Sequence, residues 1–225
     1  MSDFSIVALT LRTALLAALI EAPFGIAIAW LLARKQWFGK SIVETIVSLP
    51  LVMPPVATGL ILLKVLGRRS PIGKPLHDLG FDIIFTWRGI VVAMAVMSFP
   101  LLVRASRIAF EDVPDRLEQI ARTLGARPVR VFFTITLPLA KRGVIGGLLL
   151  AFARSLGEFG ATILVAGNIP GRTTTIATSI YNAVQLGQDE DAYRLLLFAV
   201  VIAFAAVWTS EALSRQRTRR KATSV

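Results

Sequence analysis

Residues 115–138 read DRLEQIARTLGARPVRVFFTITLP, and this stretch is polar and basic in a chain that is otherwise mostly apolar. Four apolar residues in it recur at the spacing of one helical face and predict a helix: Leu117, Ile120, Ala121 and Leu124. Gly125 can adopt the left-handed conformation that ends a helix, and Pro128 suits the first turn of the next one. The stretch therefore predicts two short helices joined by a tight elbow, with the second helix stopped at Leu137-Pro138.

A compact pair of helices with an apolar face and a basic rim has the shape of an element that enters a groove on another protein. The alternative is an amphipathic helix that lies on an anionic lipid surface.

The composition of the rest of the chain indicates a membrane protein. Of its 225 residues, 55% are hydrophobic, and the mean hydropathy is +0.67, which is too apolar for an ordinary soluble domain. We expect an all-α polytopic fold, because about 20 apolar residues are needed for a helix to cross a bilayer. The predicted membrane domain covers residues 6–213, with five spans at 6–33, 41–66, 89–110, 143–166 and 195–213 and a basic tail at 214–225.

The distribution of positive charge predicts the orientation of the chain. Sixteen of the 25 Lys and Arg residues fall on one side of the predicted spans: Arg34, Lys35, Lys40, eight between Arg104 and Arg142, and five between Arg215 and Lys221. Eight fall on the other side. Because cytoplasmic loops carry the excess of Lys and Arg, the amino terminus is expected outside and the carboxyl terminus inside. The net charge of +11 is thus assigned to topology and to binding of membrane lipid by the tail, and no nucleic acid is expected.

The second predicted span contains three prolines, Pro50, Pro54 and Pro55, which remove backbone donors at membrane depth. Broken backbone at that depth is tolerated inside protein or beside a water-filled cavity. The span is therefore a candidate for lining a pathway, together with Ser48 and Thr58. A kink that serves only packing is the alternative.

Charged residues inside spans need a partner, because a lone charge in hydrocarbon costs at least about 2.5 kcal/mol. Glu21 is expected to face the bundle interior. Arg154 and Glu158 are four residues apart, so we expect them to share a helix face and to form an intramembrane ion pair.

The sequence predicts a transport protein rather than an enzyme. Gly39-Lys40-Ser41 resembles the end of a phosphate-binding loop, but Arg34 stands where that motif needs glycine, so no nucleotide site is expected. The single histidine, His77, offers no metal-binding cluster, and no group of residues suits catalysis.

The basic stretch also resembles the cytoplasmic coupling loop of ABC-importer permeases, in which Glu-Ala-Ala is followed by three residues, Gly, nine residues and Ile-x-Leu-Pro. Gly125, Ile135, Leu137 and Pro138 match this pattern, whereas Gln119-Ile120-Ala121 stands where Glu-Ala-Ala is expected, with Glu118 just before it. The resemblance implies a coupling loop over residues 115–138 that contacts a partner ATPase through a set of residues: Glu118, Gln119, Ala121, Leu124, Gly125, Ala126, Val131, Phe132, Ile135, Leu137 and Pro138. Leu124, Gly125, Val131 and Phe132 are expected to enter the groove of the ATPase.

Much of the chain is similar to the molybdate ABC-transporter permeases of bacteria. The similarity lies in residues 49–55, 67–69, 98–105, 117–138, 152–162 and 168–171. It implies an inner-membrane homodimer that works by alternating access with two cytoplasmic ABC ATPases and a periplasmic molybdate-binding protein. ATP and magnesium would be bound by the ATPases, and this chain would bind no cofactor.

A pathway for molybdate, a tetrahedral dianion, should offer hydroxyl groups and backbone donors that bind it weakly. The candidate pathway residues are Ser48, Pro50, Pro54, Thr58, Ser98, Ser155 and Thr162. A permease for tungstate or sulfate is the nearest alternative, since those anions have the same shape. A non-ABC membrane enzyme or scaffold is a further alternative, and the lack of a His, Cys or carboxylate cluster suited to catalysis argues against it. A passive channel is another alternative, and it has no need of a coupling elbow.

Overall fold

The computed structural model describes the backbone of residues 2–222 and the side chains of residues 2–212. Every regular element in this part of the chain is a helix. The long helices are α1 (Asp3–Arg34), α5 (Trp87–Glu111), α8 (Leu137–Leu156) and α11 (Asp189–Ala222). The shorter ones are α2 (Lys40–Val52), α3 (Pro55–Leu66), α4 (Gly73–Asp78), α6 (Asp115–Thr123), α7 (Pro128–Val131), a π-helix (Phe132–Thr136), α9 (Gly160–Val165) and α10 (Ile176–Gln185).

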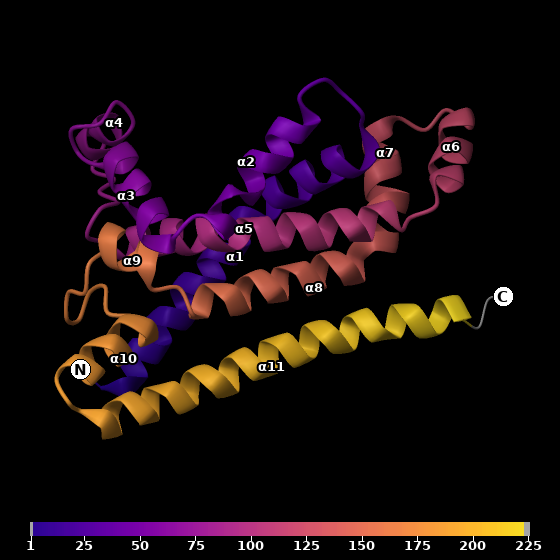
Figure 1. Ribbon diagram of the computed structural model, residues 1–225. Helices are drawn as coiled ribbons and strands as arrows, with labels where there is room; N and C mark the ends of the chain where they lie inside the picture. The colour runs from indigo at the N-terminus through magenta and orange to yellow at the C-terminus, as the bar shows by residue number, and fades with distance from the viewer. Residues whose placement is uncertain (1, 223–225) are drawn as a thin grey trace.

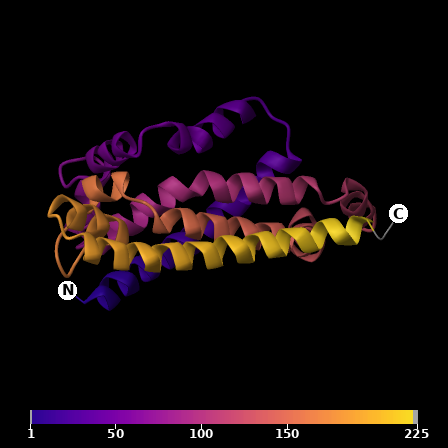
Figure 2. The same ribbon diagram turned by 60° about the horizontal axis from the view of Figure 1, so that its bottom comes forward.

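The centre of the bundle is formed by α1, α5 and α8, with α5 packed extensively against both α1 and α8. Helix α11 covers α8 on one side, while α2 and α3 form a layer on the other side of α5, as Figures 1 and 2 show. The largest fully buried side chains include Phe110, Leu32, Met94 and Leu102, all from α1 and α5. These two helices therefore provide the framework on which the functional elements are placed.

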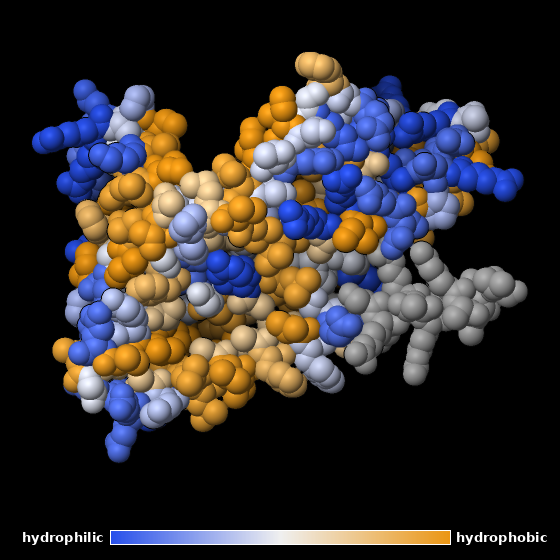
Figure 3. All heavy atoms as spheres, in the orientation of Figure 1, coloured by the Kyte–Doolittle hydropathy of each residue, from blue (hydrophilic) through white to orange (hydrophobic). Residues whose placement is uncertain are grey.

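The molecule has two polar ends separated by an apolar band (Figure 3). The start of α1, α4 and α10 lie at one end, which we call the amino-terminal end; α6, α7 and the last turns of α11 lie at the other (Figure 1). Among the described residues, four helices are long and apolar enough to cross a bilayer, and the bent pair of α2 and α3 makes a fifth crossing if it is counted as one span. The prediction of an all-helical multi-pass membrane protein is confirmed.

The second span is broken where the prolines predicted a break. Helix α2 ends at Val52 and α3 begins at Pro55, with a bend of 114° between them. Because Pro54 and Pro55 supply no backbone N–H, the first turn of α3 leaves fewer donors unsatisfied than another sequence would.

The fourth span differs from its predicted bounds at both ends. Leu137-Pro138 does not stop a helix: α7, the π-helix and α8 run on without interruption from Pro128 to Leu156. In the π-helix the Leu137 N–H bonds to the Phe132 carbonyl, and this wider turn accommodates Pro138, whose ring would clash with the turn before it in a regular helix. At the other end, the helix stops at Leu156 rather than continuing to residue 166, and the short helix α9 follows.

Helices α3 and α9 approach closely because glycine occupies both sides of the contact. A Cβ atom added to Gly59 would lie 2.8 Å from the Ala161 Cα, and one added to Gly160 would lie 2.7 Å from the Pro55 Cβ. Small residues that allow such backbone contact are a common means of helix association in membranes. The contact attaches α3 to the rest of the bundle.

We expect Gly59→Ala to destabilise the folded protein by about 1–3 kcal/mol, because the new methyl group meets backbone atoms that cannot move aside. The measurement is the thermal unfolding midpoint of the detergent-purified protein, with Leu60→Met, a volume-conserving change on the exposed side of α3, as the control. Equal midpoints for the two variants would contradict the close contact.

Candidate functional site

The polar stretch in the middle of the chain folds as the predicted elbow, which we define as residues 115–131. Helix α6 ends in a turn in which the Ala126 N–H bonds to the Ala121 carbonyl at 3.0 Å and Gly125 has a φ of +83°. A left-handed glycine with these bonds is a common helix terminator. Pro128 then begins α7, only a few residues after α6 has ended.

Helix α6 turns its apolar residues away from the rest of the chain. Leu117 and Ile120 are exposed, and Leu124 at the tip of the elbow is 83% exposed. Of the nine residues of α6, only Glu118 is buried. An apolar stripe that its own chain leaves uncovered is available to a partner protein.

Val131 and Phe132, which we expected to enter a partner's groove, pack against their own chain instead, with Phe132 half-buried. Val131 is buried, and the Phe132 ring packs against Trp30 and Phe110 at centroid distances of 5.5 and 6.0 Å. Their apolar character serves the attachment of the elbow to α1 and α5. Of the four residues expected in the groove, Leu124 and Gly125 remain on the surface.

The other residues of the predicted coupling set divide between surface and interior. Gln119 and Pro138 are exposed, while four residues are half-buried: Ala121, Ala126, Ile135 and Leu137.

A cluster of charged residues joins the elbow to the end of α1. Arg34, the last residue of α1, places its Nε 3.0 Å from Glu118 Oε1 as an ion pair, without the alignment of a hydrogen bond. The same guanidinium donates to the Asp115 carboxylate and, at 2.7 Å, to the Val113 carbonyl. Thr136 in the π-helix donates to Glu118 Oε1 at 2.8 Å. We call Arg34, Asp115, Glu118 and Thr136 the elbow clamp.

Sequence reasoning missed Arg34, whose position after the first apolar run suggested only a charge that sets topology. It also placed Glu118 among the residues facing a partner, whereas this carboxylate is directed into its own chain. Arg34 and Glu118 are far apart in the sequence, so no local sequence pattern predicts that they pair.

The seven candidate pathway residues do not line one surface within this chain. Ser48 is accessible and accepts a hydrogen bond from Arg104 Nη2 at 3.1 Å. Thr58 and Thr162 are buried, with hydroxyl groups that have no hydrogen-bond partner among the described residues. Ser155 is buried and donates to the Ala151 carbonyl at 3.0 Å.

The remaining pathway candidates lie around the first crossing and the broken one. Pro54 is exposed at the bend between α2 and α3. Pro50 lines an apolar cavity of about 470 Å³ between α1, α2 and α5 that Glu21 also borders. Glu21 is buried, as expected, with its Oε2 2.9 Å from the Ser98 hydroxyl.

The predicted ion pair of Arg154 and Glu158 forms, but the two residues do not share one helix face. Arg154 Nη2 lies 3.0 Å from Glu158 Oε2, while α8 ends at Leu156 between the two residues. The second oxygen of Glu158 accepts the Ala161 N–H at 2.8 Å. Glu158 therefore neutralises Arg154 and also satisfies a donor at the positive end of α9.

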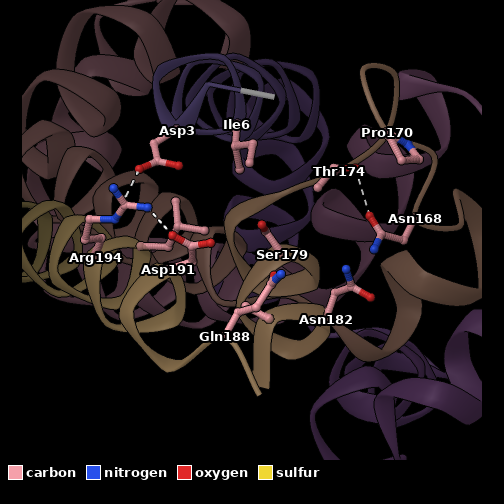
Figure 4. Close-up of a pocket in the computed structure, with 12 residues that line it drawn as sticks. Asp3, Ile6, Asn168, Pro170, Thr174, Ser179, Asn182, Gln188, Asp191 and Arg194 are labelled. Atoms are coloured by element: carbon pink, nitrogen blue, oxygen red, sulfur yellow. Dashed lines mark hydrogen bonds and ion pairs between the residues drawn. The ribbon is translucent and has the colours of Figure 1, made fainter. Parts of the chain in front are cut away.

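The amino-terminal end carries a polar pocket of about 270 Å³ between α1, α10 and α11. Figure 4 shows Arg194 between Asp3 and Asp191 on its wall, and Thr174 donating to Asn168. Such a pocket can receive polar side chains of a partner.

A second polar cluster at the same end surrounds Asp82. Its carboxylate receives two hydrogen bonds of 3.1 Å from Arg68 and lies 2.8 Å from His77 Nδ1. Desolvation raises the pKa of Asp82, but the contacts with His77 and Arg68 outweigh it and hold the pKa below its ordinary value. The cluster closes the loop that carries α4.

Comparison with known proteins identifies the family. Residues 22–216 match the model of the binding-protein-dependent transport system inner membrane component. The chain belongs to this family. It is 51% identical over 215 residues to the molybdenum transport system permease protein ModB of Escherichia coli (strain K12), covering 95% of this chain and 94% of that one. It is 46% identical to the ModB protein of Haemophilus influenzae, covering 97% and 96% of the two chains.

The fold is also that of a solved transporter. A bacterial alginate ABC transporter in complex with a pentasaccharide-bound periplasmic protein superposes with a TM-score of 0.71 at 22% identity, covering 96% of this chain and 79% of that one. As an inner membrane component of a binding-protein-dependent transport system, this permease is a transport subunit. An elbow with an uncovered apolar stripe at one end of a membrane bundle suits such a subunit.

We expect Arg154→Met and Glu158→Gln each to destabilise this permease, by about 1–3 kcal/mol, because each leaves a poorly solvated polar partner behind. The double variant should lose less stability than the sum of the losses in the two single variants, since it leaves no unpaired charge. Thermal unfolding of the purified proteins measures the three losses. Additive losses would show that the two side chains do not act as a pair.

Proposed function

We propose that this chain is the membrane-spanning permease of an ATP-driven molybdate importer, and that it works as a homodimer by alternating access. Two cytoplasmic ATPases and a periplasmic molybdate-binding protein complete the transporter. The observation that carries the proposal is the elbow, which exposes an apolar stripe at one end of the helical bundle. The chain that carries it is similar to molybdenum permeases over nearly its full length.

The elbow fits the role of the surface that receives the ATPase. Leu117, Ile120 and Leu124 offer an apolar stripe, and burying the exposed part of each side chain in a partner's groove would contribute about 1–2 kcal/mol. The elbow also carries a basic rim made of Arg116, Arg122 and Arg127. The end that carries the elbow has the larger share of positive charge, which supports a cytoplasmic elbow and a periplasmic amino terminus.

A second copy of the chain is the proposed partner for the layer formed by α2 and α3. These helices bury few of their residues, and several of their large apolar side chains are exposed: Ile42, Ile46, Leu49, Val52, Val56, Leu60 and Ile61. Figure 3 shows a hollow between the two arms that α2 and α3 form. Two hollows facing each other would enclose a central route bordered by broken backbone, as membrane pathways require.

Molybdate is the proposed cargo because both relatives are molybdenum permeases. Arg104 and Ser48 are an accessible polar pair on the side of α2 and α5, and together they offer a positive charge and a hydroxyl to an oxyanion. Weak, exposed contacts of this kind attract a dianion without retaining it.

At the amino-terminal end, the pocket of Figure 4 and the Asp82 cluster provide the polar surface on which a binding protein would deliver its cargo.

The direct test is uptake of labelled molybdate into proteoliposomes that contain the chain with the ATPase and binding protein of its own organism. We expect uptake to require ATP and the binding protein, and to be inhibited more by tungstate than by the same concentration of sulfate. Uptake in the absence of ATP would indicate a channel. Inhibition mainly by sulfate would assign the chain to sulfate transport instead.

We expect Gly125→Val to reduce both molybdate uptake and the ATP hydrolysis that accompanies uptake by about tenfold or more. A β-branched residue is strongly disfavoured at a φ of +83°, so the elbow would open, although nothing lies within 4 Å of the added Cβ to clash with it.

The matched control is Gly125→Asn, because asparagine tolerates the left-handed conformation. It should retain most of the uptake. If Gly125→Val and Gly125→Asn lose the same amount of uptake, the defect lies in the contact with the ATPase rather than in the backbone conformation.

A further inference from the structure

Helix α6 is attached to its own chain mainly by charge. Its large apolar residues, Leu117 and Ile120, are exposed, and Glu118, at 4% exposure, is its one buried residue. Within α6, Asp115 contacts Arg34 at the start of the helix and Glu118 contacts it one turn later. The burial of apolar surface that normally holds a short helix in place is therefore largely missing here.

Arg34 connects the carboxyl end of α1 to α6. Its side chain is 9% exposed, it is the last residue of α1, and it reaches the Val113 carbonyl as well as the two carboxylates of α6. Its planar guanidinium can hold several acceptors at once in a fixed geometry, which a lysine cannot do. Thr136 extends the same network to the π-helix that leads into α8.

We propose that the elbow clamp makes α6 and the carboxyl end of α1 move as one rigid body, so that a push on the elbow displaces the first membrane span directly. Arg34 is thus a positioning residue for the coupling of ATP hydrolysis to transport. This inference rests on the proposed function, because it assumes that an ATPase moves the elbow.

The route through Arg34 is distinct from the covalent route through α7 and α8. Apolar packing does not fill the junction of α1 and α6: a polar pocket of about 210 Å³ lies there, lined by Ala33, Arg34, Lys35, Asp115, Glu118, Gln119 and Arg122. Without the clamp, α6 would be able to shift toward this space while α1 stayed in place. The polar contacts of Arg34 are therefore what would carry a displacement of α6 to α1.

The test uses the complete transporter in proteoliposomes and compares Arg34→Gln, Glu118→Gln and the double variant with Lys35→Gln. Lys35 is the exposed neighbour of Arg34, and its replacement removes the same charge without touching the clamp. We expect Arg34→Gln to assemble with the ATPase and to hydrolyse ATP, but to import about fivefold less molybdate per ATP. The double variant should be no worse than either single variant, because all three break the same link.

A second measurement covers the case in which Arg34→Gln does not assemble. The chain contains no cysteine, so spin labels can be attached to Lys35→Cys and Gln119→Cys, two exposed positions beside the clamp, with Arg34 and Glu118 intact. The distance between the labels should stay the same with and without ATP. A change of more than about 5 Å, roughly the rise of one helical turn, would overturn the proposal.

The two proposals fail in different ways. If the unaltered transporter does not import molybdate, the proposed function is wrong. If it does, and Arg34→Gln imports as much molybdate per ATP as Lys35→Gln, the clamp does not couple the elbow to α1.

Discussion

The arrangement of this permease depends on how buried charge is satisfied at the ends of its helices. Glu118 is taken out of water at the junction of α1, α6 and the π-helix, where Arg34 and Thr136 surround it. Removing a carboxylate from water is unfavourable unless it gains an opposite charge and hydrogen bonds. The position of α6, and with it the direction of the apolar stripe on the elbow, follows from that requirement.

The same requirement governs the interruption in the fourth crossing. Where α8 ends, Glu158 pairs with Arg154 and accepts the Ala161 N–H. A helix can stop at membrane depth only when the groups that it leaves unpaired find other partners. At the bend between α2 and α3, prolines serve a similar purpose by lacking the donors that would need satisfying.

Close helix packing supplies the remaining order. Glycine at positions 59 and 160 brings α3 and α9 into backbone contact, and the larger side chains of α1 and α5 fill the centre. The faces left uncovered, on the elbow and on the layer of α2 and α3, are those that the proposed transporter would use to bind its ATPase and its second copy.

Several features were determined by the sequence alone, because they depend on local chemistry. Apolar runs of sufficient length predicted the crossings, Gly125 and Pro128 predicted the elbow, and the prolines predicted the broken span. The tertiary structure alone decided which faces are buried. It buried Glu118 and Val131 and packed Phe132 against the chain. It also continued the helix through Pro138 by means of the π-helix, and it paired Arg34 with Glu118, a carboxylate far along the chain. These outcomes depend on which helices come together, and helical periodicity does not encode that.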